Sequence, residues 1–110
     1  MSKIPKFYLF IDDERQPTPH WSNIVNDYIV VICRNYAESI QALDMLAKQN
    51  LSMIVDFDHD LGEEKTGYDI AKYIVESGYE NIEFRVHSMN IVGRKNITEL
   101  LTHYGYEELK

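Results

Sequence analysis

Four short apolar segments along the chain have the pattern of β-strands. Each is five or six residues long, contains mainly aliphatic or aromatic residues, and is bounded by polar or turn-forming residues. The runs at residues 7–11 and 51–55 are typical of buried strands, and the first has the pattern of a parallel strand that is covered on both faces. The predicted strands cover residues 7–11, 28–33, 51–55 and 82–86, and the tail at 104–110 can add a stub of strand.

Three segments between and after these strands repeat apolar residues at intervals of three and four, which predicts amphipathic helices. Asn35 can cap the first helix, and Thr66 with Asp69 can form a capping box at the start of the second. Gly78 can adopt the left-handed backbone conformation that ends the second helix. The helices are expected over residues 36–49, between Thr66 and Gly78, and from residue 91 or 92 to about 103.

Residues 14–27 have no helical periodicity and contain Pro17 and Pro19. We expect an ordered loop with at most one helical turn there. Loops of this length in a small domain are often functional. His20 and Trp21 could stack on a base or ribose, although a single tryptophan in a small domain more often fills the core.

Strands that alternate with helices in this way predict one α/β domain, spanning residues 1–110, with a parallel sheet and right-handed crossovers. In such a sheet the carboxyl ends of all strands open on the same edge. Polar residues that are far apart in sequence should therefore meet in one crevice. These residues are Asp12, Asp13, Asp58, His59, Asp60, His87, Ser88 and Asn90.

The third predicted strand runs directly into Asp56, Asp58 and Asp60, and if it stays extended these three side chains point to one side. Three adjacent carboxylates repel one another, and burial would raise the pKa of at least one of them. The pattern therefore favours a divalent cation held by oxygen ligands. The alternative is that these acids merely end a strand and cap a loop.

Composition and charge narrow the classes of function. The chain has 110 residues, with 18 acids against 11 bases, a formal charge of −7 and no strongly basic run, so an extended nucleic-acid interface is not expected. Cys33 is the only cysteine, which excludes an internal disulfide and a thiolate zinc cluster. No apolar run approaches the roughly 20 residues of a membrane span, and no signal-peptide layout is present. We expect a soluble, cytoplasmic protein that does not bind membranes.

The strand-end residues resemble those of the receiver domain of two-component response regulators. Asp12 and Asp13 follow the first strand, Asp58 precedes Leu61 by three residues, and Ser88 follows the fourth strand. In that family the acidic pair binds magnesium, the acid at the Asp58 position accepts a phosphoryl group, and the hydroxyl at the Ser88 position senses it. The resemblance implies a flavodoxin-like three-layer sandwich with a parallel sheet of four to five strands.

Two departures from the receiver pattern argue against a simple phosphorylation switch. A loop around residues 17–23 replaces the first crossover helix. The chain also ends soon after the third helix, so the fifth strand, which carries the essential lysine of receivers, is missing or vestigial.

A closer resemblance is to a receiver-like family that is predicted to process cyclic phosphates. It covers about residues 7–105 and implies hydrolysis of a cyclic phosphate on a nucleotide, an ADP-ribose derivative or an RNA end. Four blocks carry it, in matching order: residues 9–15 (LFIDDER), 58–62 (DHDLG), 66–69 (TGYD), and 87–90 (HSMN) followed by Gly93 and Arg94.

The resemblance and the residue types together suggest three sets of site residues. The predicted ligands of Mg²⁺ or Mn²⁺ are Asp12, Asp13, Asp58 and Asp60. The predicted catalytic residues are Asp58, His59, His87 and Ser88. The predicted phosphate-binding residues are Arg15, Ser88, Asn90 and Arg94. Either a water molecule or Asp58 could be the nucleophile.

Each of these roles has a structural alternative. His59 and His87 could be held in hydrogen-bond networks at the strand ends, and Asn90 could cap the last helix. Arg15 and Arg94 could pair with surface glutamates. At the level of the whole protein, the alternative to an enzyme is a non-catalytic receiver-like module that binds a divalent metal, phosphate or a protein partner.

Overall fold

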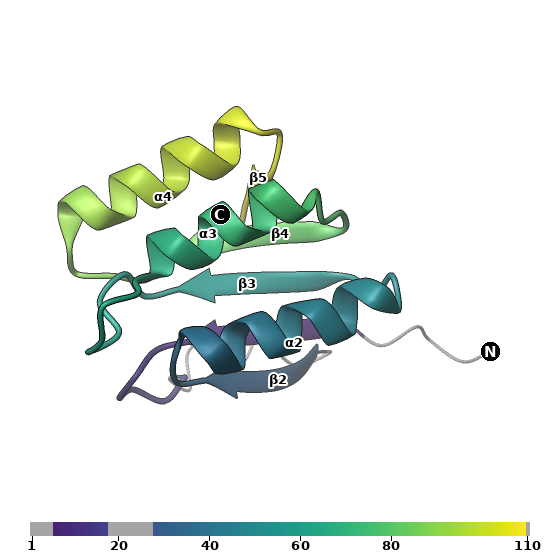
Figure 1. Ribbon diagram of the computed structural model, residues 1–110, viewed down its shortest axis with the longest axis horizontal. Helices are drawn as coiled ribbons and strands as arrows, with labels where there is room; N and C mark the ends of the chain where they lie inside the picture. Colours follow the sequence, from purple (N-terminus) through teal and green to yellow (C-terminus); the bar gives the residue numbers. More distant parts are fainter. Residues whose placement is uncertain (1–5, 18–27, 110) are drawn as a thin grey trace.

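The structure of the chain is a computed structural model that describes residues 6–17 and 28–109 (Figure 1). One sheet of five parallel strands has the order β2-β1-β3-β4-β5. The strands are β1 (Lys6–Ile11), β2 (Tyr28–Cys33), β3 (Met53–Phe57), β4 (Ile82–Val86) and β5 (Glu107–Glu108). The helices in the described residues are α2 (Tyr36–Lys48), α3 (Gly67–Ser77) and α4 (Ile91–His103). This order confirms the predicted receiver-like α/β fold, including the stub of a fifth strand.

Strand β3 begins and ends two residues later than the sequence pattern predicts. It covers Met53–Phe57 instead of residues 51–55, and all five of its residues are buried. Phe57 still lies beside Ile11 of β1 and Val86 of β4, so the pairing continues past Asp56 on both sides. An acid can occupy this central strand because its carboxylate is hydrogen-bonded, as described below.

The loop that was predicted in place of a first crossover helix lies mostly outside the described residues. Residues 14–17 belong to the structure and contain no helix. The predictions for His20 and Trp21 fall on residues 18–27, outside the described ranges.

The described helices all cover one face of the sheet (Figure 1). Alternate residues of the strands, such as Leu9, Val55 and Phe84, join these helices in the main hydrophobic cluster. The opposite face carries a smaller buried cluster of Tyr8, Phe10 and Ile54. Asp56 alternates with Val55 and Phe57 and therefore points to this second face.

The predicted helix caps are present. The side chain of Asn35 accepts a hydrogen bond of 2.8 Å from the backbone of Glu38 at the start of α2. At the start of α3, the Asp69 carboxylate accepts one of 2.8 Å from the backbone N–H of Thr66. Gly78 ends α3 with a left-handed φ of 67°. In the described part of the chain, no helix has the length and apolar character needed to cross a membrane.

Gly67, the first residue of α3, brings this helix into contact with the strand end that carries Asp58. Its N–H donates a hydrogen bond of 2.8 Å to the carbonyl of His59. A Cβ atom at this position would lie only 2.0 Å from the backbone oxygen of Asp58. Only glycine therefore allows α3 to start this close to the Asp58–His59 backbone.

Gly67→Ala is expected to destabilise the protein by about 1–3 kcal/mol, the usual cost of forcing extra atoms into a packed region. In an ordinary helix the same change would stabilise by up to about 1 kcal/mol, so the sign of the effect tests the contact. Denaturant unfolding measures it, with Ser77→Ala at the exposed end of the same helix as the control. An increase in stability would show that the close approach does not constrain the fold.

Candidate functional site

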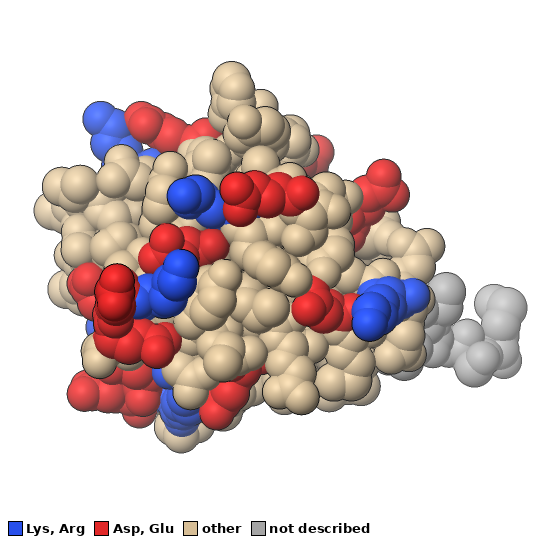
Figure 2. Space-filling model, in the orientation of Figure 1, with Lys and Arg blue, Asp and Glu red and all other residues tan. Residues whose placement is uncertain are grey.

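A cleft of about 340 Å³ opens at the carboxyl edge of the sheet. Its walls come from the segments that follow β1, β3 and β4, as parallel topology predicts. Figure 2 shows acidic side chains gathered at this end of the molecule, the end toward which the strand arrows point in Figure 1. The lining residues are Asp12, Asp13, Glu14, Arg15, Asp58, Asp60, Gly62, Ser88, Met89 and Asn90.

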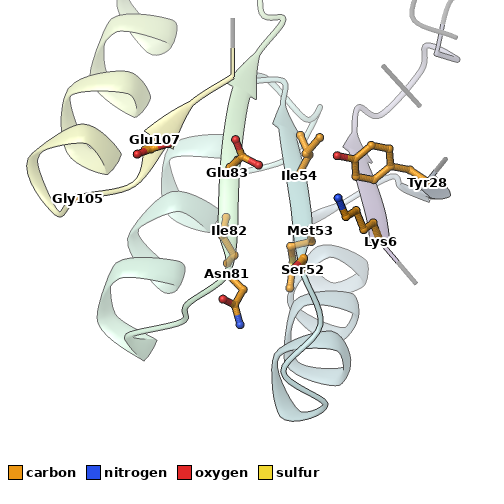
Figure 3. Close-up of a pocket in the computed structure, with 10 residues that line it drawn as sticks. All are labelled: Lys6, Tyr28, Ser52, Met53, Ile54, Asn81, Ile82, Glu83, Gly105 and Glu107. Atoms are coloured by element: carbon orange, nitrogen blue, oxygen red, sulfur yellow. The ribbon is translucent and has the colours of Figure 1, made fainter. Parts of the chain in front are cut away.

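A second hollow, of about 370 Å³, lies at the opposite, amino edge of the strands (Figure 3). Lys6, Glu83 and Glu107 contribute its charged groups. It contains none of the predicted site residues, and ligands of open parallel sheets bind beyond the carboxyl ends of the strands. The carboxyl-edge cleft is therefore the candidate site.

Asp12 is held in a fixed position at the base of this cleft, with 1% of its surface exposed. Its Oδ1 accepts backbone hydrogen bonds from Glu14 (2.9 Å) and Arg15 (2.8 Å), and its Oδ2 lies 3.0 Å from Nε2 of His87. Burial alone would raise the pKa of Asp12, but these hydrogen bonds together hold the pKa below its usual range. Asp12 is therefore a preorganised carboxylate.

Asp58 lies beside Asp12, but its pKa is shifted in the opposite direction. It is 7% exposed, and its Oδ1 accepts a hydrogen bond of 2.8 Å from the backbone of His59. Burial, followed by the negative charge of Asp12, raises the pKa of the Asp58 carboxyl. A cation between Asp12 and Asp58 would relieve both effects.

Asp12, Asp58 and His87 form a cluster that could hold a metal ion, because their ligand atoms lie within 4.8 Å of one another. Two carboxylates that repel each other fit a hard divalent cation, and an imidazole is compatible with Mn²⁺ more than with Mg²⁺. Asp13 lines the same cleft and is half-buried. The side chain of Asp60 is 68% exposed and lies outside the cluster.

His87 is the centre of a buried hydrogen-bond chain that joins three strands. Its Nδ1 lies 2.7 Å from Oδ1 of Asp56, and the hydroxyl of Tyr8 donates to the other oxygen of Asp56 at 2.5 Å. The imidazole stacks on the ring of Phe10, with centroids 4.7 Å apart. Both ring nitrogens of His87 face carboxylates, and His87 does not line the cleft. It therefore lies on the side of Asp12 that faces away from the cleft.

The stability of the metal-free protein is expected to fall as the pH rises above neutrality. Burial alone would lower the pKa of His87, but Asp56 and Asp12, together with the charge of nearby Asp58, raise it overall. A histidine with a raised folded-state pKa stabilises the fold fully below its unfolded pKa of about 6.5, and this contribution is lost as the pH passes the folded-state pKa.

Urea unfolding between pH 6 and 9 in the presence of EDTA measures this dependence. His87→Gln should remove most of the decline in unfolding free energy across this range, because no imidazole then titrates between Asp56 and Asp12. An unchanged pH profile in this variant would contradict the assignment.

His59 lies on the other side of the Asp58 backbone and packs on the start of α4. A Cβ atom on Gly93 would lie 2.3 Å from Cγ of His59, so glycine at this position makes room for the imidazole ring. Nδ1 of His59 lies 3.0 Å from Oδ1 of Asp60. Asn90 caps α4, since its Oδ1 accepts from Gly93 at 2.9 Å, and its amide donates to Asp60 at 3.2 Å. This confirms the capping alternative for Asn90 and leaves its phosphate-binding role as a prediction.

Ser88 and Arg15 are the predicted phosphate-binding residues that line the cleft together with Asn90. Oγ of Ser88 is buried and accepts a hydrogen bond of 3.0 Å from the backbone of Asn90, which leaves its hydroxyl hydrogen to donate. Arg15 is half-exposed and its Nε lies 3.6 Å from Oδ2 of Asp12. Arg94 is exposed on α4 and does not line the cleft.

Some residues that organise the site were not recognised in the sequence. The guanidinium of Arg34 donates to the carbonyls of Asp12 (3.0 Å) and Arg15 (2.5 Å), and so holds the loop after β1. Tyr8 and Asp56 orient His87 from within the sheet. Asp56 was expected to join Asp58 and Asp60 around a cation, but it is fully buried and belongs to neither the cleft lining nor the metal cluster. An acid inside an apolar segment was the available signal for Asp56, since a buried carboxylate requires partners.

Comparison with known proteins identifies the family. The family model described as "Cyclic-phosphate processing Receiver domain" matches residues 7–103. No significant match was found among curated proteins or among solved structures. The matched region contains every strand end that forms the cleft, and the chain therefore belongs to the family of cyclic-phosphate processing receiver domains.

Proposed function

We propose that this protein is a cytoplasmic, metal-dependent phosphoesterase that opens a cyclic phosphate on a nucleotide, an ADP-ribose derivative or an RNA end. The observation that carries the proposal is the juxtaposition of Asp12 and Asp58 in one cleft, where the pKa of Asp58 is raised partly by the charge of Asp12. If the site bound no cation, nothing would offset the repulsion between the Asp12 and Asp58 carboxylates.

Asp12, Asp13 and Asp58 are the residues that would hold Mg²⁺ or Mn²⁺. When bound, the ion would neutralise charge on a phosphate oxygen and lower the pKa of a water molecule. His87 would act as a positioning residue, because it contacts Oδ2 of Asp12 and does not line the cleft. Metal ligands that are oriented by such partners typically bind the metal more tightly.

Ser88 and Arg15 would bind the phosphate from the remaining walls of the cleft. The hydroxyl of Ser88 would donate a hydrogen bond to one phosphate oxygen, and the half-exposed guanidinium of Arg15 could offer two parallel donors. Asn90 fixes the orientation of this wall because it caps α4 and donates to Asp60.

The chemical step breaks one P–O bond of the cyclic phosphate, and the departing ribose oxygen takes up a proton. His59 is the candidate donor: its ring does not itself line the cleft, but it is partly exposed and its Nδ1 lies 3.0 Å from Asp60, which does line it. The nucleophile is either water, which gives the monoester directly, or Asp58, which gives an acyl phosphate that water then cleaves.

Phosphorus NMR tests this proposal. The protein would be incubated with 2′,3′-cyclic nucleotides and with ADP-ribose 1″,2″-cyclic phosphate, with Mg²⁺, Mn²⁺ or EDTA. We expect the cyclic phosphorus signal to convert to a monoester signal only when metal is present. If neither metal supports conversion, the proposal of a hydrolase is wrong, and the non-catalytic binding module becomes the better interpretation. Conversion in EDTA would show that the reaction does not require a metal ion.

A further inference from the structure

Three apolar side chains on the rim of the cleft are the most exposed large hydrophobic side chains among the described residues. Met89 and Ile91 are each 81% exposed, and Val92 is 69% exposed. They lie within four consecutive residues around Asn90, the N-cap of α4. Clustered apolar residues at this level of exposure are unfavourable in water and mark binding surfaces more often than isolated ones do.

This apolar rim, defined as Met89, Ile91 and Val92, is continuous with the candidate site. Met89 lines the cleft itself, beside Ser88 and Asn90. Ile91 and Val92 are the first two residues of α4, directly after the cleft-lining residues Met89 and Asn90, and both are exposed. A ligand whose phosphate occupies the cleft could therefore reach Met89 and the start of α4 with a group beyond its ribose.

The charge of the cleft favours a substrate that gains part of its affinity outside it. Among the described residues its lining contains five acids, and Arg15 is the single basic residue. Apart from what a metal ion contributes, this lining repels a phosphate. Apolar contact with an uncharged part of the substrate is the interaction that the surrounding surface can supply.

We propose that the apolar rim binds the base of a nucleotide whose phosphate lies in the cleft, so that Met89, Ile91 and Val92 determine a preference for nucleotides over base-free sugar phosphates. This inference rests on the proposed function, whose substrate class it narrows. A flat base offers two apolar faces, and the flexible side chain of Met89 can adapt to either a purine or a pyrimidine.

The test compares ligands with and without a base. NMR titration in Mg²⁺ measures the dissociation constants of AMP and of ribose 5-phosphate for the wild type, Met89→Gln and Ile91→Gln. The matched control is Met45→Gln, since Met45 is 55% exposed on α2 and does not line the cleft. Exposed positions were chosen so that the substitutions do not disturb folding.

We expect the wild type to bind AMP more tightly than ribose 5-phosphate. Each rim variant should weaken AMP binding by roughly tenfold, as loss of one apolar contact does, and leave ribose 5-phosphate unchanged. For any cyclic nucleotide that is turned over, KM should rise by a similar factor while kcat stays the same. Met45→Gln should match the wild type in every measurement.

Equal affinity for the two ligands, or rim variants that bind AMP like the wild type, would overturn the inference. A wild-type dimer that dissociates in the rim variants during sedimentation would also overturn it, because the surface would then bind a second copy of the chain. If base-dependent binding is found but no cyclic phosphate is hydrolysed, the inference stands and the proposed reaction fails.

Discussion

Replacing Asp58 with asparagine is expected to reduce the proposed metal-dependent turnover by about 10³-fold or more, because in that mechanism Asp58 is a metal ligand and the alternative nucleophile. The substitution preserves the shape of the side chain. Its Oδ1 can still accept the hydrogen bond from the backbone of His59, which is 2.8 Å in the native structure. The effect should therefore come from the lost charge.

The same substitution should make the metal-free protein more stable. The pKa of Asp58 is raised by burial and by the charge of Asp12. A carboxyl with a raised folded-state pKa stabilises the fold fully below its unfolded pKa of about 3.9, and this contribution is lost as the pH rises through the folded-state pKa. At neutral pH its ionised form therefore opposes folding, and its removal should add about 1 kcal/mol, as other changes at functional sites do.

Thermal unfolding with and without Mg²⁺ measures both consequences. At a metal concentration 100 times the dissociation constant, the wild type should gain about 2.7 kcal/mol, and Asp58→Asn should gain far less. Asp60→Asn is the matched control, since this carboxylate is exposed and lies outside the cluster. If Asp60→Asn abolished the metal-dependent gain while Asp58→Asn retained it, the ion would have to be placed at the outer end of the cleft.

Much of the fold could be predicted because its determinants are local in sequence. The capping residues Asn35 and Thr66, the left-handed glycine Gly78 and the spacing of apolar residues all act within one or two helical turns. The parallel topology followed from the alternation of strands and helices. It correctly predicted that the strand ends carrying Asp12, Asp58 and Ser88 would meet in one cleft.

The interior of the site could not be predicted because its determinants are distant in sequence. Asp56 is 48 residues from Tyr8 and 31 from His87, yet it bonds both. An apolar run interrupted by an acid looks like the end of a strand, which is why β3 was predicted to end too early. The two close approaches at Gly67 and Gly93 likewise depend on backbone positions that only the folded chain defines.

Asp56→Asn tests whether this buried chain of hydrogen bonds supports the site. We expect it to destabilise the protein by about 3 kcal/mol, the low end of the cost of breaking a buried ion pair, because Asp12 still faces the other nitrogen of His87. Tyr8→Phe should cost less, about 1–2 kcal/mol, since it removes the hydroxyl's hydrogen bonds but leaves the pair of Asp56 with His87 intact. Urea unfolding at pH 6, where His87 is charged, measures both.

If Asp12 holds a metal ion as proposed, Asp56→Asn should weaken its binding through His87 and Asp12. Loss of the carboxylate at Nδ1 frees the imidazole to turn away from Oδ2 of Asp12, and the loss of such an orienting partner usually weakens metal binding by about 10–100-fold. Titration of Mn²⁺ by electron paramagnetic resonance measures this without any substrate. Glu83→Gln, an exposed carboxylate-to-amide change on the adjacent strand β4, should alter neither stability nor metal affinity. If Asp56→Asn behaved like Glu83→Gln in both measurements, His87 would hold its position without Asp56, and Phe10, which stacks on its ring, would be the residue to vary next.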